Sequence, residues 1–178
     1  MLLMKNTKKT TFCAILSALA AVVMLVSYFP YFTYAVPAVA GLLVMVTVIE
    51  IGCKWAFLTY ISSAFLAFLF AETESKLIFI CFFGFYPIVK CLIEKFRKPV
   101  IEWILKLLVF NLCVISLYYI FAEVLMLSFE DMGKLAEYGA VILLILGNIV
   151  FVVYDIAVSR LAVTYIYRLH PKIEKLLK

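Results

Sequence analysis

The sequence predicts an all-α membrane protein, a bundle of six transmembrane helices with both termini in the cytoplasm. Three observations support this prediction. First, 67% of the 178 residues are hydrophobic and only 15% are charged, whereas roughly 25% are charged in a soluble domain. Second, the apolar residues form long runs between short polar breaks. Third, the lysines and arginines fall almost entirely at alternate breaks. A soluble fold of this size has too little interior to bury so much apolar surface.

The polar breaks divide the chain into six spans that form a single domain. A transmembrane helix needs about 20 apolar residues, within a range of roughly 17–25. The second and third spans are short, so they could instead form one interrupted segment. Glu50 and Lys54 favour a turn, because two charges near the bilayer centre would be costly. Pro99 suits a first helical turn, and Pro87 should kink the fourth span. The predicted spans are residues 12–29, 35–51, 55–70, 77–94, 100–122 and 139–161, followed by a basic tail at 162–178.

The distribution of basic residues predicts the orientation. Fourteen lysines and arginines fall at one set of helix ends and two, Lys76 and Lys134, at the other. Basic residues concentrate on the cytoplasmic side of membrane proteins, so both termini should lie in the cytoplasm of a cell-membrane protein. The net charge of +5 is then an orientation signal, and we expect no nucleic-acid partner.

The beginning of the chain leaves two questions open. A basic segment precedes the first span and the sequence ALA occurs at residues 18–20, as in a cleaved signal peptide. Against cleavage, the apolar run continues through Val26, and five remaining spans would place the termini on opposite sides. Met4 is an alternative start.

Charged residues within the spans lie near the predicted cytoplasmic ends. Three opposite-charge pairs are spaced four residues apart, which places each pair on one helix face. Asp155 and Arg160 lie at the same depth of the sixth span. We interpret these residues as a collar of ion pairs; a proton or ion relay is the alternative, but it would need charges strung through the membrane. The three pairs are Glu50 with Lys54, Lys90 with Glu94, and Glu102 with Lys106.

Amide and phenol side chains nearer the middle of the spans suggest a small pocket. Asn111 and Asn148 lie near the centres of the fifth and sixth spans, where an amide must find a partner. One interpretation is hydrogen bonding between the two helices. The other is an outward-facing pocket between spans four to six, with the aromatic segment at 27–37 serving as an interface anchor or as a lid. The candidate ligand-binding residues are Tyr34, Tyr86, Asn111, Tyr118, Tyr119, Glu123 and Asn148.

Signatures of enzymes and metal sites are missing from the sequence. It contains no GxxxxGK[ST], HExxH or GxSxG motif. One histidine, His170, is too few for a multi-histidine metal cage. We therefore expect no catalytic residue, no resident metal and no cofactor.

The first span carries small residues at helical spacing, namely Ala14, Ser17, Ala18 and Ala21. Small residues let helix backbones approach closely, and this approach drives association in lipid. The strip could therefore pack on another helix of this chain or on a separate protein.

This strip, in a basic N-terminal segment that reads KKTTFCAILSALAAVV, resembles the first helix of the substrate-binding S components of energy-coupling factor (ECF) transporters. Those proteins also have six spans in fewer than 200 residues, with both ends inside. Ala14 and Ala18 match the alanine–three–alanine pattern by which that helix docks on a transmembrane T component. The resemblance covers the topology of the whole chain but only one short motif.

The resemblance implies a transport function. The chain would capture a vitamin-like nutrient from outside, beneath the loop between spans one and two, and would topple when two separate ATPases drive the T component. The scarcity of histidine excludes the metal-binding members, and the residues of the outer half favour a small, largely apolar or aromatic ligand.

Two other functions remain open. One is a membrane scaffold that transports nothing, similar to rod-shape envelope proteins with an S-component-like fold, whose basic tail would lie along anionic lipid. The other is a small enzyme or flippase that acts on lipid, with Glu123 or Asp155 as the working carboxylate.

Overall fold

The computed structural model describes residues 6–29, 31–124 and 133–171. All regular structure in these ranges is helical, which confirms the prediction of an all-α protein. Five segments are long and apolar enough to cross a membrane. A further apolar helix, Ala35–Glu50, has 16 residues. The chain is therefore a multi-pass membrane protein. The five long segments are Asn6–Tyr28, Cys53–Phe70, Thr73–Phe96, Pro99–Ile120 and Leu144–Arg168.

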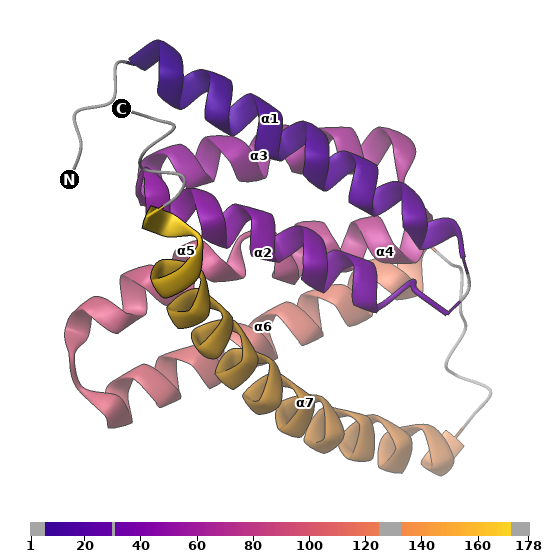
Figure 1. The fold of residues 1–178 in the computed structure, drawn as a ribbon. Helices are drawn as coiled ribbons and strands as arrows, with labels where there is room; N and C mark the ends of the chain where they lie inside the picture. Colours follow the sequence, from indigo (N-terminus) through magenta and orange to yellow (C-terminus); the bar gives the residue numbers. More distant parts are fainter. Residues whose placement is uncertain (1–5, 30, 125–132, 172–178) are drawn as a thin grey trace.

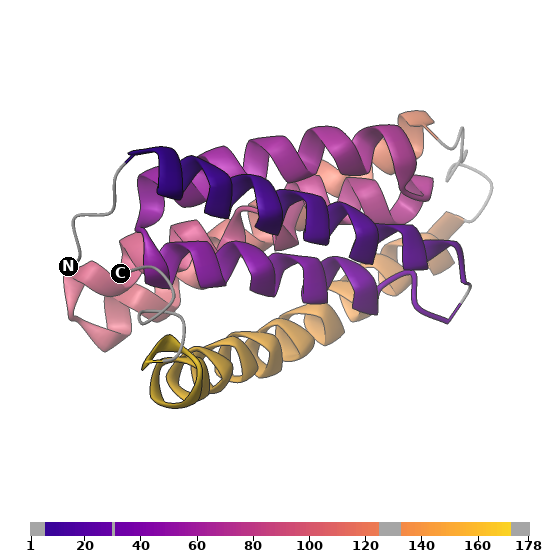
Figure 2. The same ribbon diagram turned by 45° about the horizontal axis from the view of Figure 1, so that its top comes forward.

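The helices run back and forth along one bundle (Figure 1). Helices α1, α2 and α3 lie side by side, and α7 crosses obliquely on the far side of α2 from α1 (Figures 1 and 2). The start of α1 and the end of α7 lie at the same end of the bundle. In chain order the elements are α1 (Asn6–Leu25), η1 (Val26–Tyr28), α2 (Ala35–Glu50), α3 (Cys53–Phe70), α4 (Thr73–Ile78), η2 (Phe79–Phe83), α5 (Tyr86–Ile93), η3 (Glu94–Phe96), α6 (Pro99–Val124) and α7 (Gly133–Arg168).

Small residues form the contact surface of α1, α2 and α3. Ala20, Ala40 and Ala56, one from each helix, are completely buried. The Ser17 hydroxyl of α1 donates hydrogen bonds to the carbonyls of Cys13, 2.8 Å away, and of Thr59 on α3, 3.2 Å away. Because lipid provides no hydrophobic drive between helices, such close approach supplies the packing energy.

A turn at Gly52 separates α2 from α3. Its φ of 108° is a conformation that residues with a side chain rarely adopt. The predicted second and third spans therefore correspond to two helices, α2 and α3, which are separated at Gly52.

The fourth predicted span is not a regular helix. Between α4 and α5 the chain forms a π-helical turn, η2, in which the Gly84 N–H donates to the Phe79 carbonyl at 2.8 Å. The Tyr60 hydroxyl of α3 donates to the Ile80 carbonyl at 2.8 Å. Pro87 lies in the first turn of α5, where a missing N–H is tolerated. The irregular segment that Pro87 predicts is thus η2, which lies on the N-terminal side of the proline. The Tyr60 side chain of α3 binds one of the carbonyls of this segment.

Gly41 lets α2 pack directly against this irregular turn. A Cβ atom at residue 41 would lie 2.4 Å from the carbonyl oxygen of Phe83. Phe83 precedes Pro87 by four residues, so its carbonyl is the one that the proline leaves without its helical N–H partner. Glycine permits a close contact between this carbonyl and the α2 backbone.

Helix α6 is long and sparsely covered by the rest of the chain. Only 11% of the apolar window of α6 is buried, against 44% of the Thr73–Phe96 window. Helix α7 continues to Arg168, so residues 162–168, which the sequence assigns to a basic tail, extend the same helix. Residues 172–178 lie outside the described ranges.

Candidate functional site

An apolar cavity of about 230 Å³ lies between η2, α6 and α7. This is the location between spans four to six that the sequence predicts for a pocket. We call it the aromatic cavity. Its walls are two helix faces with spacing i, i+3, i+4, i+7, together with the π-helical turn. Its lining residues are Ile78, Phe82 and Phe83, then Phe110, Cys113, Val114 and Leu117 of α6, and Gly147, Val150, Phe151 and Tyr154 of α7.

Stacked and edge-on rings hold the aromatic cavity in shape. Phe110 and Phe151 are stacked, with centroids 4.6 Å apart, and Phe83 meets Tyr154 edge-on at 4.9 Å. The Tyr154 hydroxyl is buried and has no hydrogen-bond partner among the described residues. An unmet buried hydroxyl typically costs about 1–3 kcal/mol. The accessible surface of the cavity is itself apolar, so this hydroxyl does not face a ligand in the cavity.

The two asparagines form a reciprocal pair between α6 and α7. The Asn111 amide nitrogen donates to the Asn148 side-chain oxygen at 3.0 Å, and the reverse bond measures 3.1 Å. Each nitrogen also donates to a carbonyl of its own helix, that of Leu107 or Leu144, at 2.8 Å. All amide hydrogens of the pair are therefore engaged in joining the helices, which is the first of the two interpretations drawn from the sequence.

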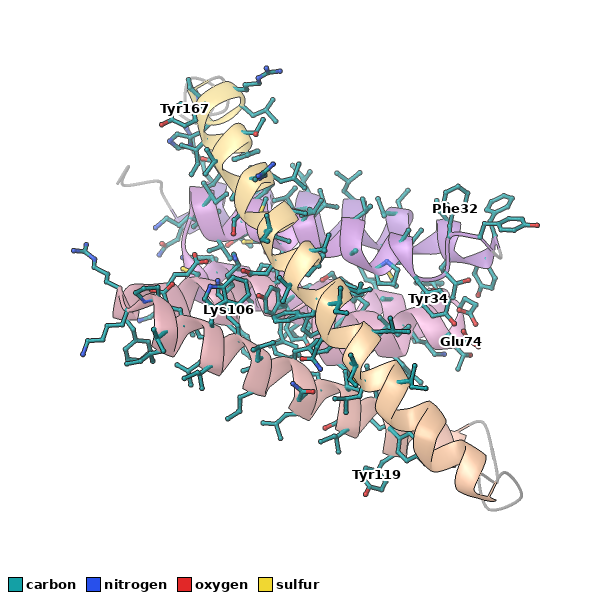
Figure 3. All side chains as sticks on the ribbon, turned by 90° about the horizontal axis from the view of Figure 1, so that it is seen from below. Phe32, Tyr34, Glu74, Lys106, Tyr119 and Tyr167 are labelled. Carbon is teal, nitrogen blue, oxygen red and sulfur yellow. The ribbon has the colours of Figure 1, made fainter. Side chains whose placement is uncertain are left out.

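The other predicted pocket residues are spread over the structure. Tyr86 is completely buried beside the aromatic cavity, with its ring 5.0 Å from that of Phe82. Tyr118 and Tyr119 are exposed on α6, and Tyr119 points away from the bundle in Figure 3. The Glu123 side chain lies outside the described part of the structure. None of the predicted side chains that the structure describes lines the aromatic cavity, and they do not converge on one pocket.

A buried ion cluster joins α5, α6 and α7. Lys90, Lys106 and Asp155 are each at most 5% exposed. Lys90 binds Asp155 Oδ1, and Lys106 reaches from α6 (Figure 3) to Asp155 Oδ2 at 3.1 Å. Both ammonium groups also contact Glu94 Oε1, at 3.0 Å from Lys90 and 2.9 Å from Lys106. Two cations and two anions make the cluster neutral, as buried charges require.

Both oxygens of Asp155 are occupied within this cluster. In addition to the two lysines, the Tyr86 hydroxyl donates to Oδ1 at 2.5 Å. The carboxylate is held in its charged form and is surrounded by donors, so it presents no free oxygen to a substrate. Its arrangement is suited to locking three helices together.

The ion pairs only partly follow the predicted scheme. The predicted pair of Lys90 with Glu94 is confirmed. Lys106 bonds to Glu94 and Asp155 in place of Glu102. The other predicted pair, Glu50 with Lys54, does not form either. The Glu50 Oε1 atom instead contacts two residues at the end of the chain, the Tyr165 hydroxyl at 2.7 Å and His170 Nδ1 at 3.0 Å. Spacing along one helix predicted these two pairs wrongly because closer partners approach from other helices.

The aromatic loop between α1 and α2 is tied to the start of α4. Tyr34 donates to Glu74 Oε2 at 3.2 Å, and the Ser75 hydroxyl donates to the Thr33 carbonyl at 2.7 Å. Figure 3 shows Tyr34 and Glu74 together at the end of the bundle opposite Tyr167. Partial burial and then the negative charge of Glu74 raise the pKa of the Tyr34 phenol. The loop is thereby linked to the segment that continues into the wall of the aromatic cavity.

The strip of small residues on α1 is divided between two surfaces. Ser17 is buried against α3, whereas Ala14 and Ala18 are exposed and Ala21 is partly covered. One face of α1 therefore packs within the chain, while the pair Ala14 and Ala18 lies on the outer surface. We call this pair, with the exposed Ile15 and Leu19 beside it, the alanine face.

Two helix faces that form the walls of the aromatic cavity can be recognised in the sequence. The spacing of Phe110 with Leu117 and of Gly147 with Tyr154 marks one apolar face on each helix. This spacing does not by itself predict a cavity, because an apolar face is equally typical of a surface that meets lipid. Which two faces oppose each other is determined by the packing of α6 and α7, and this is not written in either helix.

Within the described residues, no three histidine, cysteine, aspartate or glutamate side chains gather as metal ligands. Comparison with known proteins finds no matching family model, no similar curated protein and no similar solved structure.

Proposed function

We propose that this protein is the substrate-binding component of an ECF-type transporter in the cell membrane, with both termini cytoplasmic. The observation that carries the proposal is the alanine face. Ala14 and Ala18 remain exposed although the opposite face of α1 is sealed by α2 and α3. A surface with two small side chains lets another helix approach closely, and the T component of the transporter is the partner that the resemblance implies.

The aromatic cavity supports a small, largely apolar or aromatic ligand. Its volume of about 230 Å³ is below the roughly 300–1,000 Å³ of typical ligand pockets. Its walls carry Tyr154, whose buried hydroxyl lacks a partner among the described residues. Because the accessible surface of the cavity is entirely apolar, the ligand would be one small apolar ring system.

The loop that is tied to α4 supports a gating role. A ligand that displaced the π-helical turn η2 would move α4, to which Tyr34 and Thr33 are bonded. The loop would then close or open with ligand binding. Turns of this π-helical kind are frequent at functional sites in other proteins.

In this proposal the chain supplies binding and no catalysis. The two ATPases and the T component would supply the energy, and the exposed alanine face would transmit it to α1. Ligand capture and docking then depend on separate regions, so a change in one should leave the other intact.

The test is purification of the chain with its native lipids, followed by mass spectrometry of bound proteins and small molecules. The wild type should co-purify with a T component and two ATPases. The variant Ala14→Leu/Ala18→Leu should lose these proteins but keep the small molecule. The matched control Ala157→Leu, at an exposed position of α7, should retain both. Absence of the transport proteins from the wild-type preparation, or their unchanged recovery with the double variant, would contradict the proposal.

One observation favours the scaffold as a second candidate. Asn111 and Asn148 satisfy each other's amides, and the described lining residues of the aromatic cavity present no polar group at its accessible surface. A scaffold would use the alanine face to bind envelope-synthesis proteins. The same preparation would then contain those proteins and no small ligand.

A further inference from the structure

We propose that a second cavity, bounded by α2, α5 and α7, binds one anionic phospholipid. Its volume is about 600 Å³, far more than a lone phosphate ion needs but within the range of ligand pockets. This proposal does not depend on transport. We call the site the basic cavity. Its lining residues are Met45, Val48 and Ile49, then Pro87, Lys90, Cys91, Glu94, Lys95 and Arg97, and Val158, Ala162 and Ile166.

The lining is divided into an apolar part and a charged part. Residues 45, 48 and 49 share one face of α2, and residues 158, 162 and 166 share one face of α7. Both faces are apolar, as an acyl chain requires. The charged side chains come from the last turn of α5, from η3 and from the residue that follows it. The cavity is therefore amphipathic in the same sense as a phospholipid.

The net charge of the basic cavity is positive. Lys90 and Glu94 belong to the neutral ion cluster with Lys106 and Asp155. Two lining cations remain, Lys95 and Arg97, and neither has an ion-pair partner among the described residues. These two charges favour an anionic headgroup over a zwitterionic one.

The position of Arg97 is suited to a phosphate. Its φ of 54° is a left-handed conformation that few non-glycine residues adopt, and it ends η3 two residues before α6 begins at Pro99. The chain thus reverses at Arg97, on the rim of the cavity. A guanidinium can bind two phosphate oxygens at once. Basic pockets between transmembrane helices at the cytoplasmic side are recognised sites for anionic headgroups.

The depth of the cavity fits the headgroup region of the bilayer. The cavity lies where α2 and α7 end and α5 passes into η3, at the end of the bundle that holds the start of α1 (Figure 1). Most basic residues of the chain fall at this end, so the lipid would come from the cytoplasmic leaflet.

The experiment is native mass spectrometry of the full chain in a neutral detergent. Phosphatidylglycerol, phosphatidylcholine with the same acyl chains, and glycerol phosphate are titrated separately. We expect one bound phosphatidylglycerol with at least tenfold higher affinity than phosphatidylcholine, and no displacement by equimolar glycerol phosphate. Because one basic residue near anionic lipid is worth about fivefold in affinity, Lys95→Gln/Arg97→Gln should weaken phosphatidylglycerol binding about 25-fold.

Two matched controls distinguish a defined lipid-binding site from non-specific electrostatic attraction to the protein surface. Lys54→Gln/Lys98→Gln removes the same charge from exposed residues that do not line the cavity, and it should leave binding within about twofold of the wild type. Ala162→Phe fills the apolar part and should prevent binding although both cations remain. Ala157→Phe, on the exposed side of the same helix, should have no effect.

Four results would overturn the proposal. Equal affinity for the two phospholipids would show that charge is not recognised. Equal losses in the two double variants would show that the attraction is spread over the surface. Displacement by glycerol phosphate, or full binding by Ala162→Phe, would show that no acyl chain enters the cavity. Gel filtration of each variant verifies that it is folded, and the two independent variants, at the headgroup and at the acyl chain, keep the test valid if one does not fold.

Discussion

Helices α1, α2 and α3 associate in a different way from helices α6 and α7. In the first group, alanines and serines such as Ala20, Ala40 and Ser63 are completely buried, and the backbones approach closely. In the second group, large aromatic residues leave a cavity, and polar side chains supply the specific contacts. The pair of Asn111 with Asn148 and the ion cluster at Asp155 connect those helices.

The comparison shows two solutions to one physical problem. Helices in lipid gain nothing from burying apolar surface against each other, so they associate by close packing or by polar bonds. Close packing by many small residues produces a continuous, rigid surface. A few strong polar contacts leave room between them, and both cavities described above adjoin the helices that are held in this way. The first region is therefore suited to docking as a unit, and the second to enclosing ligands.

The ion cluster should show the largest effect of a single substitution. Asp155→Asn leaves Lys90 and Lys106 facing each other with only Glu94 between them, and the loss of a buried partner typically costs about 3–5 kcal/mol. The free energy of unfolding in mixed detergent and dodecyl sulfate measures this loss. Glu94→Gln is the control, because the Glu94 side chain is 43% exposed and exposed pairs contribute about 1 kcal/mol or less.

A triple substitution tests whether the cluster acts only as a lock. Lys90→Met/Lys106→Met/Asp155→Leu removes all the buried charges together, and such replacements are often neutral or stabilising. We expect it to recover most of the stability that Asp155→Asn loses. A triple variant as unstable as the single variant would contradict the assignment of these charges as one mutually neutralising cluster.

The close packing of α2 against the π-helical turn should show the next largest effect. In Gly41→Ala the new methyl group would meet the Phe83 carbonyl at 2.4 Å, so the backbone must move, at a cost of about 1–3 kcal/mol. In Gly147→Ala the nearest atom belongs to the Phe110 ring at 3.5 Å, an ordinary contact, and stability should be unchanged or slightly higher. The same unfolding assay compares the two; equal losses would mean that η2 does not lie against α2 in this way.

The asparagine pair should have a smaller effect. Asn111→Leu removes the reciprocal bonds and leaves Asn148 unmet, with an expected loss of about 0.6–2 kcal/mol. Asn111→Leu/Asn148→Leu should be no worse than the single variant, because no unmet amide remains. Ser116→Ala is the control, since that hydroxyl bonds to the Leu112 carbonyl of its own helix. A double variant whose loss equals the sum of the single losses would show that the amides are not coupled.

The smallest effect concerns the loop contact of Tyr34. Its pKa is raised, so its protonated form is favoured in the folded state, and the contact stabilises the fold fully below pH 10. This contribution should be lost as the pH rises through the raised pKa. The ultraviolet difference titration between wild type and Tyr34→Phe measures that pKa, and Glu74→Gln should lower it toward the ordinary value. Tyr31→Phe, which removes a tyrosine that is 95% exposed, is the control substitution.

Several features of the fold could be predicted from single segments. Apolar runs of adequate length predicted the helices, and Glu50 and Lys54 between two such runs predicted the turn. Pro87 predicted an irregular fourth pass, although not a π-helical turn. Each of these features depends on a local property of the chain, namely a missing backbone N–H, a φ angle or the apolar character of about 20 residues.

The candidate sites could be predicted only in part. Residue types indicated that Asn111, Asn148 and Asp155 need partners, but residues from other helices supply them, and Lys106 bonds to Asp155 rather than to its own neighbour Glu102. The same holds for the alanine strip, in which Ser17 is buried against another helix and Ala18 is exposed.

By itself the sequence determined that this chain is a helical, multi-pass membrane protein, because the bilayer requires every spanning backbone to satisfy its own hydrogen bonds. Only the tertiary structure decided which amide meets which, where the charges neutralise one another, and which faces enclose cavities. Those outcomes depend on how far and at what angle each helix crosses the next. That geometry follows from the packing of all the side chains together, and no single stretch of sequence contains it.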